Sequence, residues 1–429
     1  MARHQHIVSS FFNINLGARS PALLALAILA TALTIVPAAN AQTLSVLHNF
    51  SGPDGNYPLA GLTMDRAGNF YGTTTWGGAS NRGSVFRLSR AGSGWVLTTL
   101  HSFRGAPNDG AYPYSGVVFG PDGALYGTTG HGGQYGDNDG DGTVYRLQPP
   151  PTACHAVSCP WKETVIHSFG SGDDGDLPEY SNLVFDQAGN MYGTTLLGGT
   201  GFNGTVFELT PSNGGWTERV LFNFVVETGF DPFNGVILDG LGNLYGTTSS
   251  GGTSDLGVIY ELSPSGSGWT ETILASNEFP NESMAAGVVM DGQGNLYGAA
   301  GCFSSEGSEP GGIFELTPSN GSWTFNKLYT FSSGEGPCNN LTLDAAGNVY
   351  GTSLGNGLFN QGQVFKLTPS NGGWIFNSVS FNGSNGDSPS GSVILDPAGN
   401  IYGTAYYGGD GPCNLEGITG CGTVWEITP

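Results

Sequence analysis

The sequence predicts an all-β fold built from seven copies of one four-stranded unit. A Tyr-Gly pair recurs along the chain at nearly constant spacing, 73 of the 429 residues are Gly, and charged residues make up only 11%. A Gly-rich, charge-poor chain that still carries 11% aromatic residues suits short strands joined by tight turns, and it is too aromatic for a disordered segment. No long run of strong helix formers follows the N-terminal segment.

The Tyr-Gly pairs define the repeat. Their spacings are 55, 66, 53, 52, 53 and 52 residues, and Thr follows the pair in six of seven copies. The seven tyrosines are Tyr71, Tyr126, Tyr192, Tyr245, Tyr297, Tyr350 and Tyr402. Four short strands in a period of about 50 residues, repeated in series, are typical of the blades of a β-propeller.

Each unit divides into strands that we call a to d in chain order. Strand a resembles residues 235–239, and the Asp-x-x-Gly-Asn of residues 239–243 is a tight hairpin turn, in which Asp bonds its own backbone and Gly takes a positive φ. Strand b carries Tyr-Gly. Strand c carries an apolar pair, as in residues 204–211, and strand d begins at Gly-Trp, as in residues 215–224.

The two ends of the repeat array complement one another. The chain ends on a strand c at residues 422–427, so its last unit lacks strand d, and residues 44–50 match a strand d such as 98–103. We therefore expect a seven-bladed β-propeller of four-stranded antiparallel blades, closed by the N-terminal strand. The predicted blades span residues 57–103, 112–169, 178–224, 232–279, 285–331, 337–381 and 389–429, the last completed by 44–50.

Residues 1–41 are predicted to be a secretory signal peptide. Arg3 and Arg19 precede an apolar run at residues 21–36, and Ala39-Asn40-Ala41 forms a small-x-small cleavage site. The alternative is an uncleaved membrane anchor, although the run is shorter than the roughly 20 residues that span a bilayer. The mature chain, residues 42–429, is expected to be soluble and exported to the periplasm or the cell exterior, without inserting into a membrane.

The charge of the chain excludes two classes of partner. The formal net charge is -22, and removing the two Arg of the leader leaves 10 basic against 34 acidic residues, or -24. Nucleic-acid binding needs clustered Lys and Arg, and anionic lipid surfaces repel an acidic protein. Nucleic acid is therefore not an expected partner.

The sequence motif of the repeat is specific enough to suggest a family. Asp-x-x-Gly-Asn-Leu-Tyr-Gly-Thr-Thr-x-x-Gly-Gly, followed by Gly-Thr-Val-Phe-x-Leu-Thr-Pro, resembles the GloVer tandem repeat (Gloeobacter/Verrucomicrobia type) of exported bacterial proteins. Its first half is also similar to NHL-type propeller repeats. The resemblance covers essentially all of the mature chain and implies export and a propeller-like array. It implies no activity and no catalytic residue. Many members carry a C-terminal anchoring segment, whereas this chain stops at Pro429 without one.

Departures from the repeat indicate where a ligand would bind. In a propeller the b–c and d–a loops lie on one face, and here the b–c loops differ in every blade. Their candidate ligand-binding residues are Trp76, His131, Tyr135, Phe202, Phe359, Tyr406 and Tyr407, accompanied by Gln134 and by d–a loop acids such as Asp54, Asp109 and Asp176. Aromatic rings stack on the apolar faces of sugars while carboxylates and amides bind hydroxyls, so this face is predicted to bind carbohydrate. The alternative is that these aromatics only fill the ring.

Two apparent catalytic signals belong to the repeat. His48, His101 and His167 occupy one equivalent position on strand d and are expected to be structural, which leaves His131 as the histidine able to join a central site. The Gly-x-Ser-x-Gly around Ser353 is the Tyr-Gly-Thr-Thr position with Thr replaced by Ser. It lacks the strand-to-helix turn of a nucleophile elbow.

Asp137, Asp139 and Asp141 form a metal-like segment in the b–c loop of blade 2. Asp-x-Asp-x-Asp-Gly places three carboxylates on one loop, with Gly at the bend that a hard cation requires, and so predicts calcium. The twelfth position is Gln148 instead of the Glu of an EF-hand, and Tyr145 stands where shorter calcium loops have a further acid. The alternative is a solvated acidic loop.

Six cysteines follow the leader, and their places in the repeat predict the disulfides Cys154–Cys159, Cys413–Cys421 and Cys302–Cys338. The first pair shares one c–d insertion and the second shares one b–c loop. The members of the third pair lie on the same face in neighbouring blades, within the range of a disulfide. An even number of cysteines in an exported chain favours disulfides, although some could stay free or bridge to a partner.

The leading functional hypothesis is a non-enzymatic, exported binding or scaffold module whose ligand is a carbohydrate or a cell-surface protein. The alternative is a propeller enzyme, a lyase or glycan hydrolase, which needs an acid/base pair at the central opening. The inward positions of strand a read Gly, Val, Leu and Met and so disfavour that alternative. A third possibility is a purely structural envelope or matrix protein. Apart from calcium, no cofactor is expected.

Overall fold

The computed structural model describes residues 42–136, 139–151, 160–170, 172–280, 282–302, 311–319, 321–332, 336–415 and 417–429. The chain separates into two units, Met1–Ala41 and Gln42–Pro429. The predicted leader lies outside the described residues, as do Asp137, Cys154 and Cys159. Among the residues from Gln42 onward that are described, there is no helix long and apolar enough to cross a membrane.

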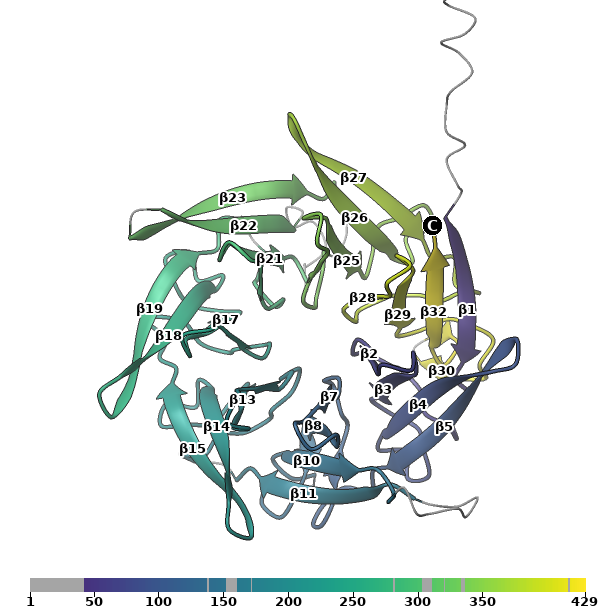
Figure 1. Cartoon of the computed structure of the whole chain (residues 1–429), viewed down its shortest axis with the longest axis horizontal. Helices are drawn as coiled ribbons and strands as arrows, with labels where there is room; N and C mark the ends of the chain where they lie inside the picture. The colour runs from purple at the N-terminus through teal and green to yellow at the C-terminus, as the bar shows by residue number, and fades with distance from the viewer. Residues whose placement is uncertain are drawn as a thin grey trace, which may run out of the picture. The chain divides into compact units, whose positions relative to one another are not determined.

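Seven four-stranded antiparallel sheets form a ring in the described part of the chain (Figure 1). This confirms the predicted seven-bladed β-propeller. We number the blades 1 to 7 from the one that begins with β2. Two short ribbons, β6 (Gly110–Ala111) with β9 (His131–Gly132) and β30 (Asn414–Leu415) with β31 (Ile418–Thr419), extend the loops of blades 2 and 7.

The strands of each blade run from the ring centre outward. The innermost strands are β2 (Thr63–Met64), β7 (Val118–Phe119), β12 (Val184–Phe185), β16 (Ile237–Leu238), β20 (Val289–Met290), β24 (Thr342–Leu343) and β28 (Ile394–Leu395). The second strands are β3 (Phe70–Thr74), β8 (Leu125–Thr129), β13 (Met191–Thr195), β17 (Leu244–Thr247), β21 (Leu296–Ala300), β25 (Val349–Ser353) and β29 (Ile401–Ala405).

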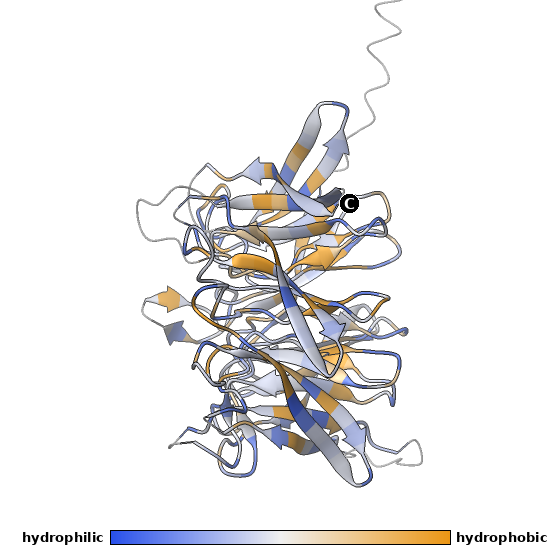
Figure 2. Cartoon of the chain, turned by 90° about the vertical axis from the view of Figure 1, so that its left-hand side faces the viewer, coloured by the Kyte–Doolittle hydropathy of each residue, from blue (hydrophilic) through white to orange (hydrophobic). Residues whose placement is uncertain are grey.

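The third strands are β4 (Ser84–Ala91), β10 (Thr143–Gln148), β14 (Thr205–Ser212), β18 (Val258–Ser265), β22 (Gly312–Ser319), β26 (Gln363–Ser370) and β32 (Thr423–Thr428). The outermost strands are β5 (Gly94–Ser102), β11 (Lys162–Ser168), β15 (Gly215–Asn223), β19 (Gly268–Ser276), β23 (Ser322–Thr330), β27 (Gly373–Ser380) and β1 (Thr43–Asn49). Along the outer strands apolar and polar segments alternate (Figure 2), because one face packs on the next blade and the other meets solvent.

The ring closes as the sequence predicts. β1 pairs with β32, with Leu44 opposite Ile427 and Ser45 opposite Glu426, so the N-terminal strand is the outer strand of blade 7 (Figure 1). Phe50, which follows β1, is fully buried in a cluster shared with Phe86 of blade 1. Closure thus combines strand pairing with a buried contact to the next blade.

The Asp-x-x-Gly-Asn turn has the expected geometry. In blade 1, Oδ1 of Asp65 accepts the backbone N–H groups of Ala67 and Asn69, both at 2.9 Å, and Gly68 has a φ of 79°. The Asn69 amide and the Tyr71 hydroxyl both donate to Oδ2 of the same carboxylate, at 2.8 and 3.1 Å. This explains why Asp, Asn and Tyr recur together.

The Gly of the Tyr-Gly pair is required by a close approach. A Cβ on Gly193 would lie 2.5 Å from the ring of Phe207 on the neighbouring strand. The same position meets Phe86 in blade 1, at 2.7 Å, and Trp425 in blade 7, at 2.4 Å. A large aromatic side chain on the third strand therefore fills the space above each Gly of the second, and stacked layers of this kind form the core of the ring.

Candidate functional site

The b–c and d–a loops meet on one face, as predicted. Isolated backbone bridges join Asn56 to Trp76, Phe230 to Ser250, and Asp387 to Tyr407, and each pairs a d–a loop with the b–c loop of the blade that follows it. These bridges hold the two variable loops of blades 1, 4 and 7 together on this face.

A pocket of about 230 Å³ lies where these loops converge. Its lining residues are Leu59, Tyr180, Phe233, Cys338, Asn339, Leu354, Ser388, Ser390, Tyr406 and Tyr407. They come from d–a loops entering blades 1, 3, 4, 6 and 7 and from b–c loops of blades 6 and 7. Loops from opposite sides of the ring can meet only near its axis, so we call this the central pocket.

Aromatic side chains form much of the central pocket. Tyr180 stacks on Phe233 with ring centroids 4.2 Å apart, and Tyr406 packs edge-on against Tyr407 at 4.5 Å. Tyr114 lies against Tyr180 at 5.3 Å. Burial raises the pKa of both Tyr180 and Tyr406, so their hydroxyls stay protonated and can donate hydrogen bonds.

One repeat position supplies much of this lining. Twelve residues before the Tyr of each Tyr-Gly pair, the blades carry in order Leu59, Tyr114, Tyr180, Phe233, Ala285, Cys338 and Ser390. The sequence did not predict this position, because the candidate residues identified in the d–a loops were acids. The available signal was that a Pro precedes it directly in most blades while the residue itself varies freely.

Blade 3 has one extra residue at this point, Glu179, between Pro178 and Tyr180. Tyr180 takes a φ of 56°, a conformation that accommodates the insertion. The Glu179 side chain is only 16% exposed, and its Oε1 lies 3.9 Å from Nε2 of His131. Glu179 also fills the space over Gly130, where an added Cβ would meet its Cγ at 2.8 Å.

The surroundings of Glu179 change its acidity. Burial, followed by the negative charge of Asp176, raises the pKa of Glu179 to about 7. Burial and the charge of Glu179 raise the pKa of Tyr114 to about 12. A carboxyl group that titrates near neutrality beside two tyrosines is the main electrostatic feature of this region.

The predicted aromatic residues divide among several places. Tyr406 and Tyr407 line the central pocket, whereas Trp76 and His131 both contact Tyr112, with ring centroids 4.5 and 5.6 Å apart. Phe202 and Phe359 lie on exposed loops, 67% and 55% exposed. The sequence therefore predicted that these loops share one face but did not predict which of their aromatics come together, and ligand binding by them stays a prediction.

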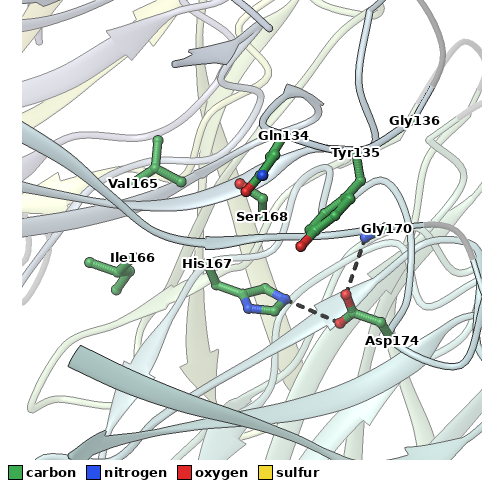
Figure 3. Close-up of a pocket in the computed structure, with 9 residues that line it drawn as sticks. All are labelled: Gln134, Tyr135, Gly136, Val165, Ile166, His167, Ser168, Gly170 and Asp174. Atoms are coloured by element: carbon green, nitrogen blue, oxygen red, sulfur yellow. Dashed lines mark hydrogen bonds and ion pairs between the residues drawn. The ribbon is translucent and has the colours of Figure 1, made fainter. Parts of the chain in front are cut away.

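Tyr135 lies away from the axis, beside the outer strand of blade 2. With Gln134 it lines a shallow cavity of about 780 Å³ whose opposite wall is formed by Val165, Ile166 and His167 (Figure 3). Nε2 of His167 lies 3.1 Å from Oδ1 of Asp174, whose Oδ2 accepts the N–H of Gly170. This peripheral groove is open and shares no residue with the central pocket.

The predicted calcium loop is partly described. Asp137 falls outside the described residues, Asp139 forms an ion pair with Arg82 at 3.4 Å, and Asp141 lies against Gly136. Calcium at this loop stays a prediction.

The predicted disulfides are confirmed where they can be seen. Cys302 is bonded to Cys338 and Cys413 to Cys421, with Cα separations of 4.5 and 4.9 Å. Cys338 lines the central pocket, so the first bond is part of its wall. The pairing of Cys154 with Cys159 lies outside the described residues.

The fold and its central pocket define a seven-bladed β-propeller with variable loops gathered at one end of its axis. The profile of the Gloeobacter/Verrucomicrobia repeat matches residues 33–184 and 179–415. The chain belongs to this repeat family. Among curated proteins, none matches the chain in sequence.

Several solved structures share the fold at low sequence identity. An ulvan lyase of polysaccharide lyase family PL25 has a TM-score of 0.54 at 12% identity, covering 89% of this chain and 95% of its own. A fungal alcohol oxidase of the AA5 family, in complex with copper, has a TM-score of 0.54 at 15% identity, covering 91% and 77%. The extracellular domain of a protein described as a hybrid two-component system from B. thetaiotaomicron has a TM-score of 0.51 at 12% identity. It covers 85% of this chain, which spans 39% of that one.

Proposed function

We propose that this protein is an exported, non-enzymatic carbohydrate-binding propeller that holds a neutral sugar in its central pocket. The observation that carries the proposal is the convergence of Tyr180, Phe233 and Tyr406 with Asn339 and two serines on the ring axis. Stacked aromatic rings cover the apolar face of a sugar, and hydroxyl and amide groups bind its hydroxyls.

The size of the pocket and the charge around it restrict the class of ligand that could bind. A volume of about 230 Å³ is below the roughly 300–1,000 Å³ of sites for drug-sized molecules, which suits one sugar residue or the end of a chain. The net charge of -22 and the acidic Glu179 near the pocket disfavour uronates and sulfated sugars.

The test is a binding screen with the purified chain against neutral gluco-, manno-, galacto- and xylo-oligosaccharides, followed by calorimetry on the best ligand. Tyr406→Ala should weaken binding at least about tenfold, equivalent to about 1.4 kcal/mol. Phe359→Ala is the matched control, because this aromatic is 55% exposed and lies outside the pocket. Absence of binding to all four classes, or equal losses in both variants, would reject the proposal.

A second candidate function is a lyase or glycan hydrolase, and Glu179 is the observation that favours it. A carboxyl group with a pKa near 7 can donate or accept a proton at neutral pH, and Tyr114 and His131 lie beside it. Incubation with polysaccharides should then release reducing ends or unsaturated products, and Glu179→Gln should abolish that release. Binding without product release would leave the binding module as the function.

Two further proposals complete this function. We expect the leader to be removed after Ala41, which N-terminal sequencing of exported protein would check. We expect calcium to bind Asp137, Asp139 and Asp141 and to raise Tm by linkage. Asp141→Asn should remove the calcium-dependent shift, whereas an unchanged Tm of the parent protein in millimolar calcium would exclude this site.

A further inference from the structure

The boundary between blades 1 and 2 carries a cluster of one imidazole and two carboxylates. His101 lies on β5, Asp109 in the loop that enters blade 2, and Glu163 on β11, the outer strand of blade 2 (Figure 1). One donor atom from each residue lies within 4.8 Å of the other two. We propose that this cluster is a binding site for one divalent transition-metal ion of the zinc type, which joins the two blades.

The distances suit ligands of a single ion. Nε2 of His101 lies 3.1 Å from Oδ2 of Asp109, and tetrahedral ligands bound to one zinc at about 2.0–2.1 Å are themselves about 3.3 Å apart, so a small adjustment would admit the ion. Backbone N–H groups of Arg104 and Gly110 donate to the same carboxylate, at 3.0 and 2.8 Å, and fix its orientation. Held in this way, Asp109 presents its oxygens to the imidazole before any ion arrives.

Glu163 supplies the second observation. Its Oε1 is a buried side-chain atom without a hydrogen-bond partner among the described residues. Burial and the charge of Asp109, which is only 7% exposed, raise the pKa of Glu163 to about 7. Two carboxylates at this depth repel each other, and a divalent cation would neutralise both, whereas a proton neutralises only one.

The repeat shows that the fold does not need Glu163. A similar His–Asp pair, His48 with Asp54 at 2.9 Å, stands at the boundary between blades 7 and 1. There the place of Glu163 on the next outer strand is taken by Leu97, and both residues pair with the equivalent Leu of the third strand. Glu stands at this position in blades 2, 3 and 4, as Glu163, Glu218 and Glu271, and the Oε1 of each is buried without a hydrogen-bond partner among the described residues. Blade 2 differs from the other two in that its carboxylate lies within 4.8 Å of donor atoms of both a His and an Asp.

The neighbouring boundary provides an internal comparison. His167 and Asp174 are 3.1 Å apart and Glu218 occupies the place of Glu163, but the three donors do not meet the 4.8 Å separation of the first cluster. We therefore expect one ion per chain, not two, at this kind of site.

The cluster is accessible to an ion from solvent. The chemistry of its three donor atoms determines which metal ion it would prefer. The three donors line an open cavity of about 500 Å³, whose lining also includes Arg104 and Lys162. No described ion pair joins either cation to Asp109 or Glu163. One imidazole nitrogen with two carboxylate oxygens suits zinc, cobalt or manganese, whereas calcium prefers oxygen ligands alone. The site is thus distinct from the loop around Asp139 in place and chemistry.

The experiment is calorimetric titration of Zn²⁺ into the untagged chain from Gln42 to Pro429, which contains all seven sheets, after treatment with a chelator. We expect one ion per chain, a Tm that rises with Zn²⁺, and visible absorption when Co²⁺ replaces it. Glu163→Gln should weaken binding at least about tenfold. Glu218→Gln, at the equivalent place in the next blade, is the matched control and should bind as the parent does.

A second variant separates loss of metal binding from loss of folding. His101→Phe should also lose the ion, and this replacement is compatible with the strand because Phe222 occupies the equivalent position in blade 3. If the parent chain shows neither heat nor a Tm shift with millimolar Zn²⁺, the cluster holds a proton only and the proposal is wrong. Full binding by Glu163→Gln or His101→Phe would place the ion elsewhere and would equally overturn it.

Discussion

Cys302 at the end of β21 is bonded to Cys338 in the loop that enters blade 6, and their Cα atoms are 4.5 Å apart. The bond crosses from one blade to the next on the variable face, and Cys338 lines the central pocket. The same covalent link therefore stabilises the boundary between blades 5 and 6 and fixes one wall of the candidate site.

Removal of this disulfide should destabilise the protein more than removal of the other. The Cys302–Cys338 bond spans 36 positions and Cys413–Cys421 spans 8. The chain-entropy model gives roughly 4 and 2.5 kcal/mol for loops of these lengths. Urea unfolding of the two Cys→Ala double variants measures the difference. A larger loss from the shorter loop would show that strain or the loss of buried contacts, not loop entropy, determines the effect.

Deletion of residues 42–50 should abolish cooperative unfolding of the ring. The deletion removes β1, the outer strand of blade 7, and Phe50, which is fully buried at the boundary with blade 1. Unpaired β32 would then expose an open edge. Differential scanning calorimetry checks this, with a chain that begins at Gln42 as the control. A deletion variant that melts as the control does would contradict the role of β1 in closure.

Gly193→Ala should cost about 1–3 kcal/mol, the usual range for overpacking. The new methyl group would lie 2.5 Å from the ring of Phe207, which is fully buried and cannot move aside freely. Gly215→Ala is the control, because nothing lies within 4 Å of its added Cβ. Equal urea midpoints for the two variants would mean that the Gly of Tyr-Gly is not required by packing.

The sequence predicted the ring better than the site, and the reason lies in the repeat. The turn at Asp65, the pairing of β1 with β32 and the bond between Cys302 and Cys338 all follow from positions that recur or from places counted along the repeat. Because the pattern occurs seven times, a strand or turn that is unclear in one unit can be recognised from the others. The incomplete last unit identifies the strand that closes the ring.

The central pocket could not be read from the sequence in the same way. Tyr180 and Tyr406 lie in different loops, about half the chain apart, and their proximity depends on how far each loop reaches toward the axis. Glu179 is one inserted residue in one blade, and its burial follows from the space over Gly130. The conformations of these loops and their inserted residues differ from blade to blade. Comparison of the repeats therefore does not predict them.

Glu179 should make the protein less stable as the pH rises. Its pKa in the folded chain, about 7, lies above the ordinary glutamate value of 4.5, so the folded state binds its proton more tightly than the unfolded state does. The stabilisation from this proton is complete below about pH 4.5 and is lost as the pH rises to about 7. Full loss corresponds to about 3 kcal/mol, at 1.36 kcal/mol per unit of pKa. The charged and titratable groups that face Glu179 are His131, Asp176, Tyr114 and Tyr180.

Comparison of Glu179→Gln with the parent chain isolates this effect from the other acids. Gln fills the same space without a charge, so the variant should unfold at the same urea concentration as the parent at pH 4.5 and at a higher concentration at pH 8. Glu227→Gln, at an exposed loop position, is the control and should show no gain at either pH. A gain that is equal at both pH values would mean that Glu179 acts through packing. A loss at pH 8 would mean that the contacts of the ionised carboxylate stabilise the folded chain more than its burial destabilises it.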